Sequence, residues 1–270
     1  MTGATTAAYP NGYTCTYPSA GTYTIRVKDN NGDKKGFTRI RFYINSTTQT
    51  DALKLIRMEQ WGTAKWSSME RAYRGAANME VNASDKPDLS GVGSMKEMFY
   101  YCSSADPDVS GWDVSTITNM SALFRGMIIA NPDVSQWNVS SVTNFSYMFA
   151  ETSNANPDLS GWDTSSAKYM NHMFYNATAA NPDVSQWDVS KVTTFYAMFK
   201  KASSTDPNVS GWDTSSATDF GYMFYNATAA NPDVSAWDTS SVTNLSYICS
   251  TVRVSPTPTS DNGMSPMSPT

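Results

Sequence analysis

The sequence predicts an α/β fold: a right-handed solenoid of about eight coils, each of 25 residues with a short parallel strand and a short helix. Two observations support this prediction. Proline and tryptophan recur at a step of 25 residues, and phenylalanine keeps the same step in a second motif. Because one coil of this length cannot bury its own apolar side chains, neighbouring coils must cover one another. The recurrent residues are Pro107, Pro132, Pro157, Pro182, Pro207 and Pro232; Trp112, Trp137, Trp162, Trp187, Trp212 and Trp237; and Phe99, Phe124, Phe149, Phe174, Phe199 and Phe224.

Within each coil, the motif P-D-V-S-G-W-D-V-S predicts a short strand. Val109, Trp112 and Val114 have the spacing L-x-x-L-x-L, in which the last two side chains share one face of the strand. This spacing is the strand signature of leucine-rich repeats, and it directs all three side chains inward. Strands of successive coils are therefore expected to be parallel and about 4.8 Å apart.

The segment after the strand predicts a short helix. A hydroxyl pair at 140–141 can cap the first free amides of a helical turn. Val142, Phe145, Met148 and Phe149 lie at i, i+3, i+6 and i+7, which is one apolar face of an amphipathic helix. The YNATAANP stretch that closes a coil ends before proline, where helix is disfavoured, so it is expected to turn the chain into the next coil.

The recurrent tryptophans have two interpretations. They either pack inside the coils or form an exposed platform for sugar rings, and the L-x-x-L-x-L placement favours burial. The phenylalanine and methionine positions are predicted to form a second buried column, in which Met fills the gaps between coils. Cys249 takes the next position of the phenylalanine column, where a thiol is expected to fill the core.

The ends of the chain differ in composition from the repeats. Residues 13–45 alternate apolar and polar side chains around Gly- and Asn-rich turns, which predicts two or three antiparallel strands. We therefore divide the chain into an N-terminal β cap at 1–50, a repeat solenoid at 51–252 and a Ser/Pro/Thr-rich flexible tail at 253–270. The first two repeat units, which begin near Leu53 and at Pro87, are irregular.

The units at 210–240 and 184–203 closely resemble the bacterial surface protein repeat of about 25 residues, the BspA-like group related to leucine-rich repeats. The matching elements are W-D-[VT]-S, V-T-x-[MF]-x-x-M-F and the return to P-D-[VL]-S, over about residues 53–252. The resemblance implies a cell-surface or extracellular protein with a role in adhesion and no fixed catalytic residues. Separately, TCTYPSAGTYTIRV resembles the last two strands of a PKD-like β-sandwich, with Cys15 where that family usually has His.

Composition argues against several classes of function. A net charge of -5 argues against a nucleic-acid or anionic-membrane partner. Cys15, Cys102 and Cys249 share no spacing, so neither a disulfide framework nor a metal site is encoded. His172 is the sole histidine and shares its register with Tyr147 and Tyr222, which predicts a position on the outside of the helix. This argues against a catalytic triad or a histidine metal site. No apolar run is long enough to span a bilayer, and the N-terminus lacks a signal-peptide pattern. The chain is therefore either intracellular or a fragment without its export signal.

Recurrent carboxylates are the one candidate site, and their register is expected to project from the strand face. Three interpretations remain open: the side chains cap turns through Ser two residues later, contact a partner, or share Ca²⁺ ions. A column of like carboxylates argues against acid–base hydrolysis, which requires unequal environments. The register consists of Asp113, Asn138, Asp163, Asp188, Asp213 and Asp238, and a second register follows proline at Asp108, Asp133, Asp158, Asp183, Asn208 and Asp233.

These observations predict a non-enzymatic surface or secreted binding module that holds a protein or glycan on a broad face. Gln136, Gln186 and the Asp113 register are the predicted partner-facing residues. We expect no cofactor apart from the alternative of Ca²⁺, no membrane insertion, and a monomeric solenoid within a larger modular chain. The alternative function is a passive spacer or stalk, including a phage fibre component, that displays another domain.

Overall fold

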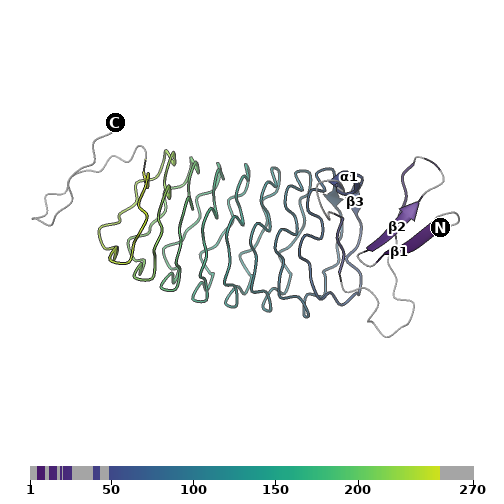
Figure 1. Ribbon diagram of the computed structural model, residues 1–270, viewed down its shortest axis with the longest axis horizontal. Helices are drawn as coiled ribbons and strands as arrows, with labels where there is room; N and C mark the ends of the chain where they lie inside the picture. Colours follow the sequence, from purple (N-terminus) through teal and green to yellow (C-terminus); the bar gives the residue numbers. More distant parts are fainter. Residues whose placement is uncertain are drawn as a thin grey trace, which may run out of the picture. The chain divides into compact units, whose positions relative to one another are not determined.

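Figure 1 shows a computed structural model of the chain, which describes residues 5–9, 12–16, 19, 21–25, 39–42 and 49–249. The chain divides into two compact units, Met1–Gly36 and Phe37–Thr270. In the first unit, β1 (Thr5–Tyr9) pairs with β2 (Gly12–Thr16) as an antiparallel hairpin, with Thr5 opposite Thr16. The sequence predicts antiparallel strands within 13–45, but β1 lies before this range and residues 21–25 form no strand. Most of 17–48 and the whole tail after 249 lie outside the described residues. The division at residues 50 and 252 and the capping role of the strands stay predictions.

The second unit begins with three short elements, α1 (Gln49–Leu53), β3 (Arg57–Met58) and β4 (Glu80–Val81), of which the two strands pair in parallel. From there to Cys249 the chain runs in successive coils that lie side by side (Figure 1). Parallel β-bridges join neighbouring coils at one register, which steps by 25 residues from Ser94 to Asn244. The right-handed, leucine-rich-repeat-like class of this coil stack stays a prediction.

The segment predicted as a helix forms consecutive turns in the structure. The amides of Met148 and Ala150 bond to carbonyls three residues earlier, at 3.1 Å each. The amides between them, those of Tyr147 and Phe149, instead bond to carbonyls of the next coil at 3.1 and 2.9 Å. An α-helix needs every one of these amides for its own i−4 carbonyls. Because the next coil uses half of them, no helix forms here.

The backbone ladder also lies elsewhere than the sequence predicts. In the P-D-V-S-x-W motif, the amide of Trp137 bonds to the carbonyl of Val134 at 3.1 Å, which closes a turn and not a strand. The parallel bridges lie further along the coil, where Asn119 pairs with Asn144. The inward direction of the motif is nevertheless as expected, since Val109 and Val114 are each 1% exposed.

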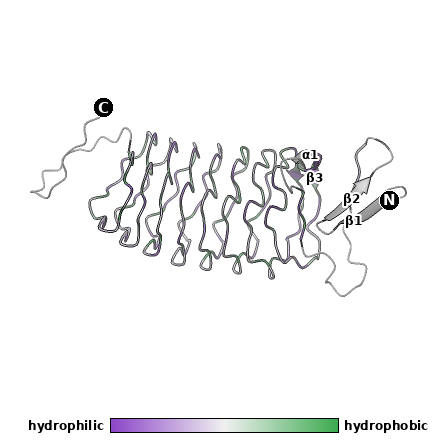
Figure 2. Ribbon diagram, in the orientation of Figure 1, coloured by the Kyte–Doolittle hydropathy of each residue, from purple (hydrophilic) through white to green (hydrophobic). Residues whose placement is uncertain are grey.

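The core consists of stacked aromatic columns. The six recurrent tryptophans are 3–9% exposed, so the buried interpretation is confirmed and the exposed sugar platform is wrong. The recurrent phenylalanines are also buried, and neighbouring rings stack with centroids 5.5–6.2 Å apart. Figure 2 shows hydrophobic and hydrophilic residues interspersed along every coil. Within each coil, the recurrent Trp and Phe side chains are buried, while the Asp side chains of the P-D-V-S and W-D-V-S motifs are exposed.

Side-chain ladders connect the coils in addition to the backbone. The hydroxyl of Thr143 donates to the carbonyl of Thr118 at 3.1 Å, and the same bond recurs 25 residues apart along the stack. Similarly, the amide of Asn156 donates to the side-chain oxygen of Asn131 at 2.8 Å, and later coils repeat this bond. These ladders satisfy polar groups at the coil edges, where no helix or long strand does so. Among the described residues, no helix is both long and apolar enough to cross a membrane.

Candidate binding surface

The structure places the predicted Asp113 register on the surface, where each side chain caps a turn. All six members are exposed. Asp113 accepts hydrogen bonds from the Ser115 hydroxyl at 2.6 Å and the Ser115 amide at 3.1 Å, and the other members accept the amide of the Ser two residues on. These bonds hold the pKa of the Asp113 carboxyl below its usual value. The turn-capping interpretation is therefore confirmed for this register.

The two glutamines predicted to face a partner make only long hydrogen bonds. The side-chain nitrogens of Gln136 and Gln186 lie 3.5 and 3.4 Å from the hydroxyl of the preceding Ser, and both residues are exposed. Within the described chain, no group of three or more His, Cys, Asp or Glu side chains is placed to hold a metal ion. Partner contact and Ca²⁺ binding by these residues stay predictions.

A second surface, which the sequence did not reveal, is a continuous row of aromatic and cationic side chains. Arg125 lies 5.4 Å from the ring centre of Tyr100 and 4.8 Å from that of Tyr147. The Tyr147 ring stacks on His172 at 4.2 Å, and further ring contacts at 5.0–5.8 Å continue the row. We call this row the aromatic–cation stripe; its members are Arg74, Tyr100, Arg125, Tyr147, His172, Tyr196, Tyr222 and Tyr247.

Left-handed turns position the stripe. Tyr147, His172, Tyr222 and Tyr247 all have φ between 52° and 60°, and all occupy one register of the repeat. Each of the first three is the third residue of a turn closed by an i→i+3 hydrogen bond, which is the type II geometry that glycine usually occupies. L-residues pay about 1–2 kcal/mol for this conformation. In this register the ring of Tyr147 stacks on that of His172, and the ring of Tyr222 stacks on that of Tyr247.

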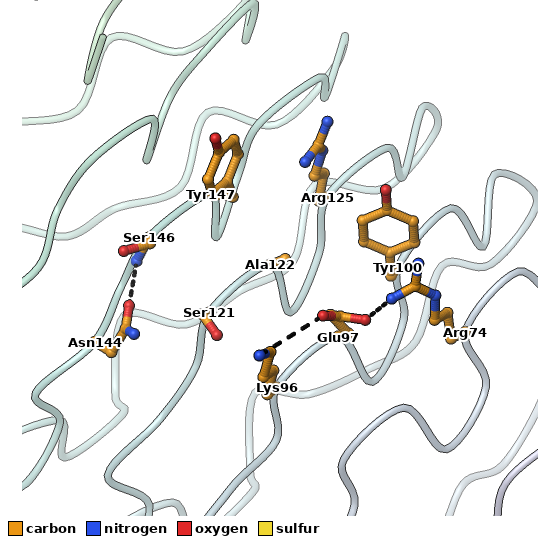
Figure 3. A pocket seen from close by; sticks show the side chains of 10 residues that line it. All are labelled: Arg74, Lys96, Glu97, Tyr100, Ser121, Ala122, Arg125, Asn144, Ser146 and Tyr147. Carbon is orange, nitrogen blue, oxygen red and sulfur yellow. Dashed lines mark hydrogen bonds and ion pairs between the residues drawn. The ribbon is translucent and has the colours of Figure 1, made fainter. Parts of the chain in front are cut away.

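A hollow of about 420 Å³ lies in the stripe near its first members (Figure 3). Its floor is formed by Ser121 and Ala122, whose side chains are small. Ala122 occupies the register that holds Glu97 in the preceding coil and Tyr147 in the following coil. The hollow therefore lies at a coil where this register holds a small side chain, that of Ala122. Figure 3 shows Tyr100 between Arg74 and Arg125 at its rim.

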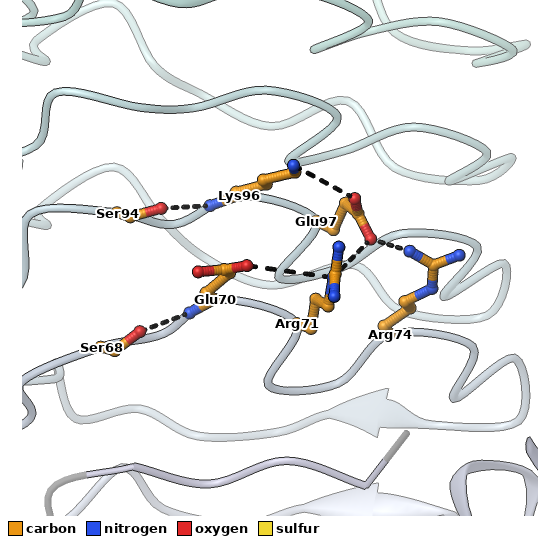
Figure 4. Close-up of polar contacts among 7 residues, drawn as sticks. All are labelled: Ser68, Glu70, Arg71, Arg74, Ser94, Lys96 and Glu97. Atoms are coloured by element: carbon orange, nitrogen blue, oxygen red, sulfur yellow. Dashed lines mark hydrogen bonds and ion pairs between the residues drawn. The ribbon is translucent and has the colours of Figure 1, made fainter. Parts of the chain in front are cut away.

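An ion network borders the hollow (Figure 4). The Glu97 carboxylate pairs with Arg74, and it also pairs with Arg71 at 3.1 Å. The Lys96 ammonium lies 3.9 Å from the same carboxylate, which is beyond hydrogen-bond distance. Glu97 is only 9% exposed, so the surrounding cations compensate a largely buried negative charge.

A second carboxylate holds Arg125 in place. Glu151 accepts a hydrogen bond from Arg125 at 2.8 Å and another from the Tyr101 hydroxyl. Burial and the bond to Glu151 raise the pKa of Tyr101 to about 12. The Nε atom of Arg125 is buried and has no hydrogen-bond partner among the described residues. The guanidinium of Arg125 is therefore held by Glu151 at one terminal nitrogen, while its Nε donor is left without an acceptor among the described residues.

His172 lies in the middle of the stripe. It contacts the rings of Tyr147, Tyr175 and Tyr196, and its Nδ1 lies 3.4 Å from the side-chain nitrogen of Asn171. Burial, together with the positive charges of Arg125 and Lys200, lowers the pKa of His172 to about 4. At neutral pH the imidazole is therefore uncharged, as its stacked position requires.

Part of this surface can be read from the sequence. His172, Tyr147 and Tyr222 share one register of the repeat, which the structure places at left-handed turns and not on the predicted helix. Tyr100, Arg125, Tyr175 and Lys200 also share a register of 25 residues, because they follow the phenylalanine column by one position. Apart from Ala150, this register holds only tyrosines and cations from Tyr100 to Tyr225, and an alignment of the coils shows it.

The stacked coils and the recurrent registers define a repeat protein. A family model described as "Mycoplasma protein of unknown function, DUF285" matches residues 67–183 and 150–260, and the chain therefore belongs to this family. No curated protein and no solved structure matches the chain significantly.

Proposed function

We propose that this protein is a non-enzymatic binding module that holds a partner along the aromatic–cation stripe, and that it acts at the cell surface or outside the cell. The observation that carries the proposal is the unbroken row of partly exposed tyrosines and cations across successive coils. Tyrosine and arginine are enriched in the energetic centres of protein interfaces. The resemblance of the units to BspA-like surface repeats supports the same location and role.

The stripe is a better candidate for this role than the Asp113 register predicted from the sequence. In that register, one carboxylate oxygen of each Asp, as in Asp113 and Asp188, accepts the hydrogen bonds that cap its own turn. The stripe residues are not required by the backbone in this way, since alanine occupies the same register at Ala122 and Ala197. Large aromatic side chains at positions that tolerate alanine indicate a role beyond folding.

The experiment compares two matched double variants on an array of purified matrix proteins and glycans. Tyr147→Asn with Tyr222→Asn removes stripe rings, and asparagine already takes the left-handed conformation at Asn176 and Asn226. Asp113→Asn with Asp188→Asn changes the other face, and asparagine already makes the same cap at Asn138. We expect the first variant to lose binding by about tenfold or more and the second to keep it.

Each other outcome has a defined meaning. Loss of binding in the aspartate variant alone would move the site to the Asp113 register. Absence of any micromolar ligand for the unaltered protein would contradict the binding function and favour a spacer or stalk. Unchanged circular dichroism of both variants is the control for folding.

A further inference from the structure

The hollow in the stripe contains hydrogen-bond donors for which the described residues supply no acceptor. The Ser121 hydroxyl and the side-chain NH₂ of Asn144 line the hollow, and neither donates to another residue of the described chain. The Lys96 ammonium contacts Glu97 only as an ion pair at 3.9 Å. Donors that point into a cavity without acceptors favour a ligand that carries lone pairs.

The charge of the lining favours an anion. Glu151, which lies outside the lining, pairs with Arg125 at 2.8 Å. The one carboxylate in the lining is that of Glu97, against the three cations of Arg74, Lys96 and Arg125. That carboxylate is already paired with two arginines and with Lys96. The chain as a whole has a net charge of -5, so this local excess of positive charge is opposite in sign to the rest of the molecule. Such a site attracts negative groups and orients them.

The aromatic rings near the hollow favour a protein ligand over a sugar. A sugar ring stacks on an open aromatic face, but the face of Tyr147 is covered by His172 at 4.2 Å with the rings 8° apart. The Tyr100 ring is in contact with both Arg74 and Arg125, at 4.4 and 5.4 Å. Ring edges and phenol hydroxyls, unlike covered ring faces, suit peptide groups and side chains.

We propose that the hollow receives a carboxylate side chain from an acidic segment of a protein partner, with Lys96 as its ionic contact and Ser121 and Asn144 as hydrogen-bond donors. This inference rests on the proposed function and names the chemistry of the partner at one end of the stripe. A hollow of about 420 Å³ has room for a single acidic side chain and its flanking backbone.

The test measures fluorescence anisotropy with two labelled peptides, one with five glutamates separated by glycines and one with glutamine at the same positions. We expect the glutamate peptide to bind about tenfold or more tightly than the glutamine peptide, with an affinity that falls as salt rises. Lys96→Gln is expected to weaken glutamate binding about fivefold or more. Lys54→Gln removes the same charge from a residue that does not line the hollow, and is expected to change binding less than about twofold.

A second variant keeps the proposal falsifiable if Lys96→Gln affects the local structure. Asn144→Asp retains the oxygen that accepts the Ser146 amide at 2.9 Å and replaces the free donors with a negative charge. Asp219 occupies the same register and accepts the corresponding amide at 2.9 Å, so the fold should tolerate this change. We expect Asn144→Asp to abolish binding of the glutamate peptide.

The outcomes separate this proposal from the proposed function. Equal binding of the two peptides, or equal losses in Lys96→Gln and Lys54→Gln, would overturn the carboxylate site. Tighter binding of a sulfated or uronate oligosaccharide, with the same dependence on Lys96, would assign the hollow to an anionic glycan instead. If Tyr147→Asn with Tyr222→Asn loses the array partner while Lys96→Gln and Asn144→Asp retain it, the stripe function stands and the hollow plays no part in it.

Discussion

At the scale of single residues, the tryptophans show how the coils are connected. The indole nitrogen of Trp187 donates to the carbonyl of Leu159 in the preceding coil at 3.2 Å, and four other tryptophans make the same bond. Trp112 is equally buried, but its indole nitrogen has no partner among the described residues. The unit that precedes it is shortened, and the carbonyl of Leu89, which corresponds in the motif to Val109, accepts the Thr116 hydroxyl at 3.2 Å instead.

This difference gives a matched pair of substitutions. Trp187→Phe and Trp112→Phe remove the same atoms from the core, but only the first removes a hydrogen bond. We therefore expect Trp187→Phe to lower the free energy of unfolding by about 1 kcal/mol more than Trp112→Phe. Urea denaturation of the two variants measures the difference. If both variants lose the same unfolding free energy, the indole hydrogen bond contributes nothing to stability.

His172 provides a prediction about pH. Its pKa is lowered to about 4 in the folded protein, against an ordinary value of 6.5, so the folded state binds this proton less readily than the unfolded chain. The stabilising contribution of the neutral ring is complete above pH 6.5 and is lost as the pH falls toward 4. His172→Tyr, which matches Tyr147 and Tyr222, should remove this part of the pH dependence.

The measurement is the unfolding free energy of both proteins between pH 7 and pH 4. Because the chain has one histidine, its proton resonances also report the pKa directly. A midpoint near 6.5 would contradict the burial of the ring between its aromatic neighbours.

At the scale of elements, the turns replace the helices and strands of a conventional repeat. The two Asp registers close turns at P-D-V-S and W-D-V-S through the Ser two residues later. These bonds lower the carboxyl pKa values, as for Asp163, Asp188 and Asp213. Groups with a lowered pKa stabilise the fold above their unfolded pKa, and this contribution is lost as the pH falls through the folded pKa.

We therefore predict that stability falls below the ordinary aspartate pKa of about 3.9. The triple variant Asp163→Asn, Asp188→Asn and Asp213→Asn should show a smaller fall, because asparagine keeps the acceptor oxygen without titrating. At pH 7 it should be about as stable as the unaltered protein, since Asn138 and Asn208 make the same bonds. Thermal melts at pH 7 and pH 3 test both statements, and a large loss at pH 7 would show that the charge itself matters.

At the scale of the whole molecule, the protein is a stack of similar units that each bond to the next in the same way. Residues 161–191 and 211–241 are nearly identical, and each coil bonds to its neighbours at the same registers. In such a stack, stability is a sum of coil and neighbour terms. Deletion of residues 161–210, two units of 25, joins Ser160 to Gly211 in register and should leave a folded, less stable protein.

A deletion of residues 161–198 serves as the control, because it breaks the register of every later coil. We expect this variant to be insoluble or unfolded, while the in-register deletion keeps a cooperative unfolding transition with a smaller denaturant dependence. Cooperative folding of both variants would show that register between coils does not specify the stack.

The period of 25 residues and the buried columns were determined by the sequence alone, because apolar spacing encodes them directly. The phenylalanine and tryptophan positions are buried as expected, and the Asp113 register caps its turns. Only the tertiary structure decided the backbone between them. The amides of Tyr147 and Phe149 bond to carbonyls of the next coil, 24 residues later in the chain. Local propensity favours a helix because it takes no account of these hydrogen bonds between coils. The stripe and its hollow depend on the same stacking, since Arg125, Tyr147 and His172 become neighbours only when the coils lie in register. Left-handed turns position Tyr147 and His172 in this row.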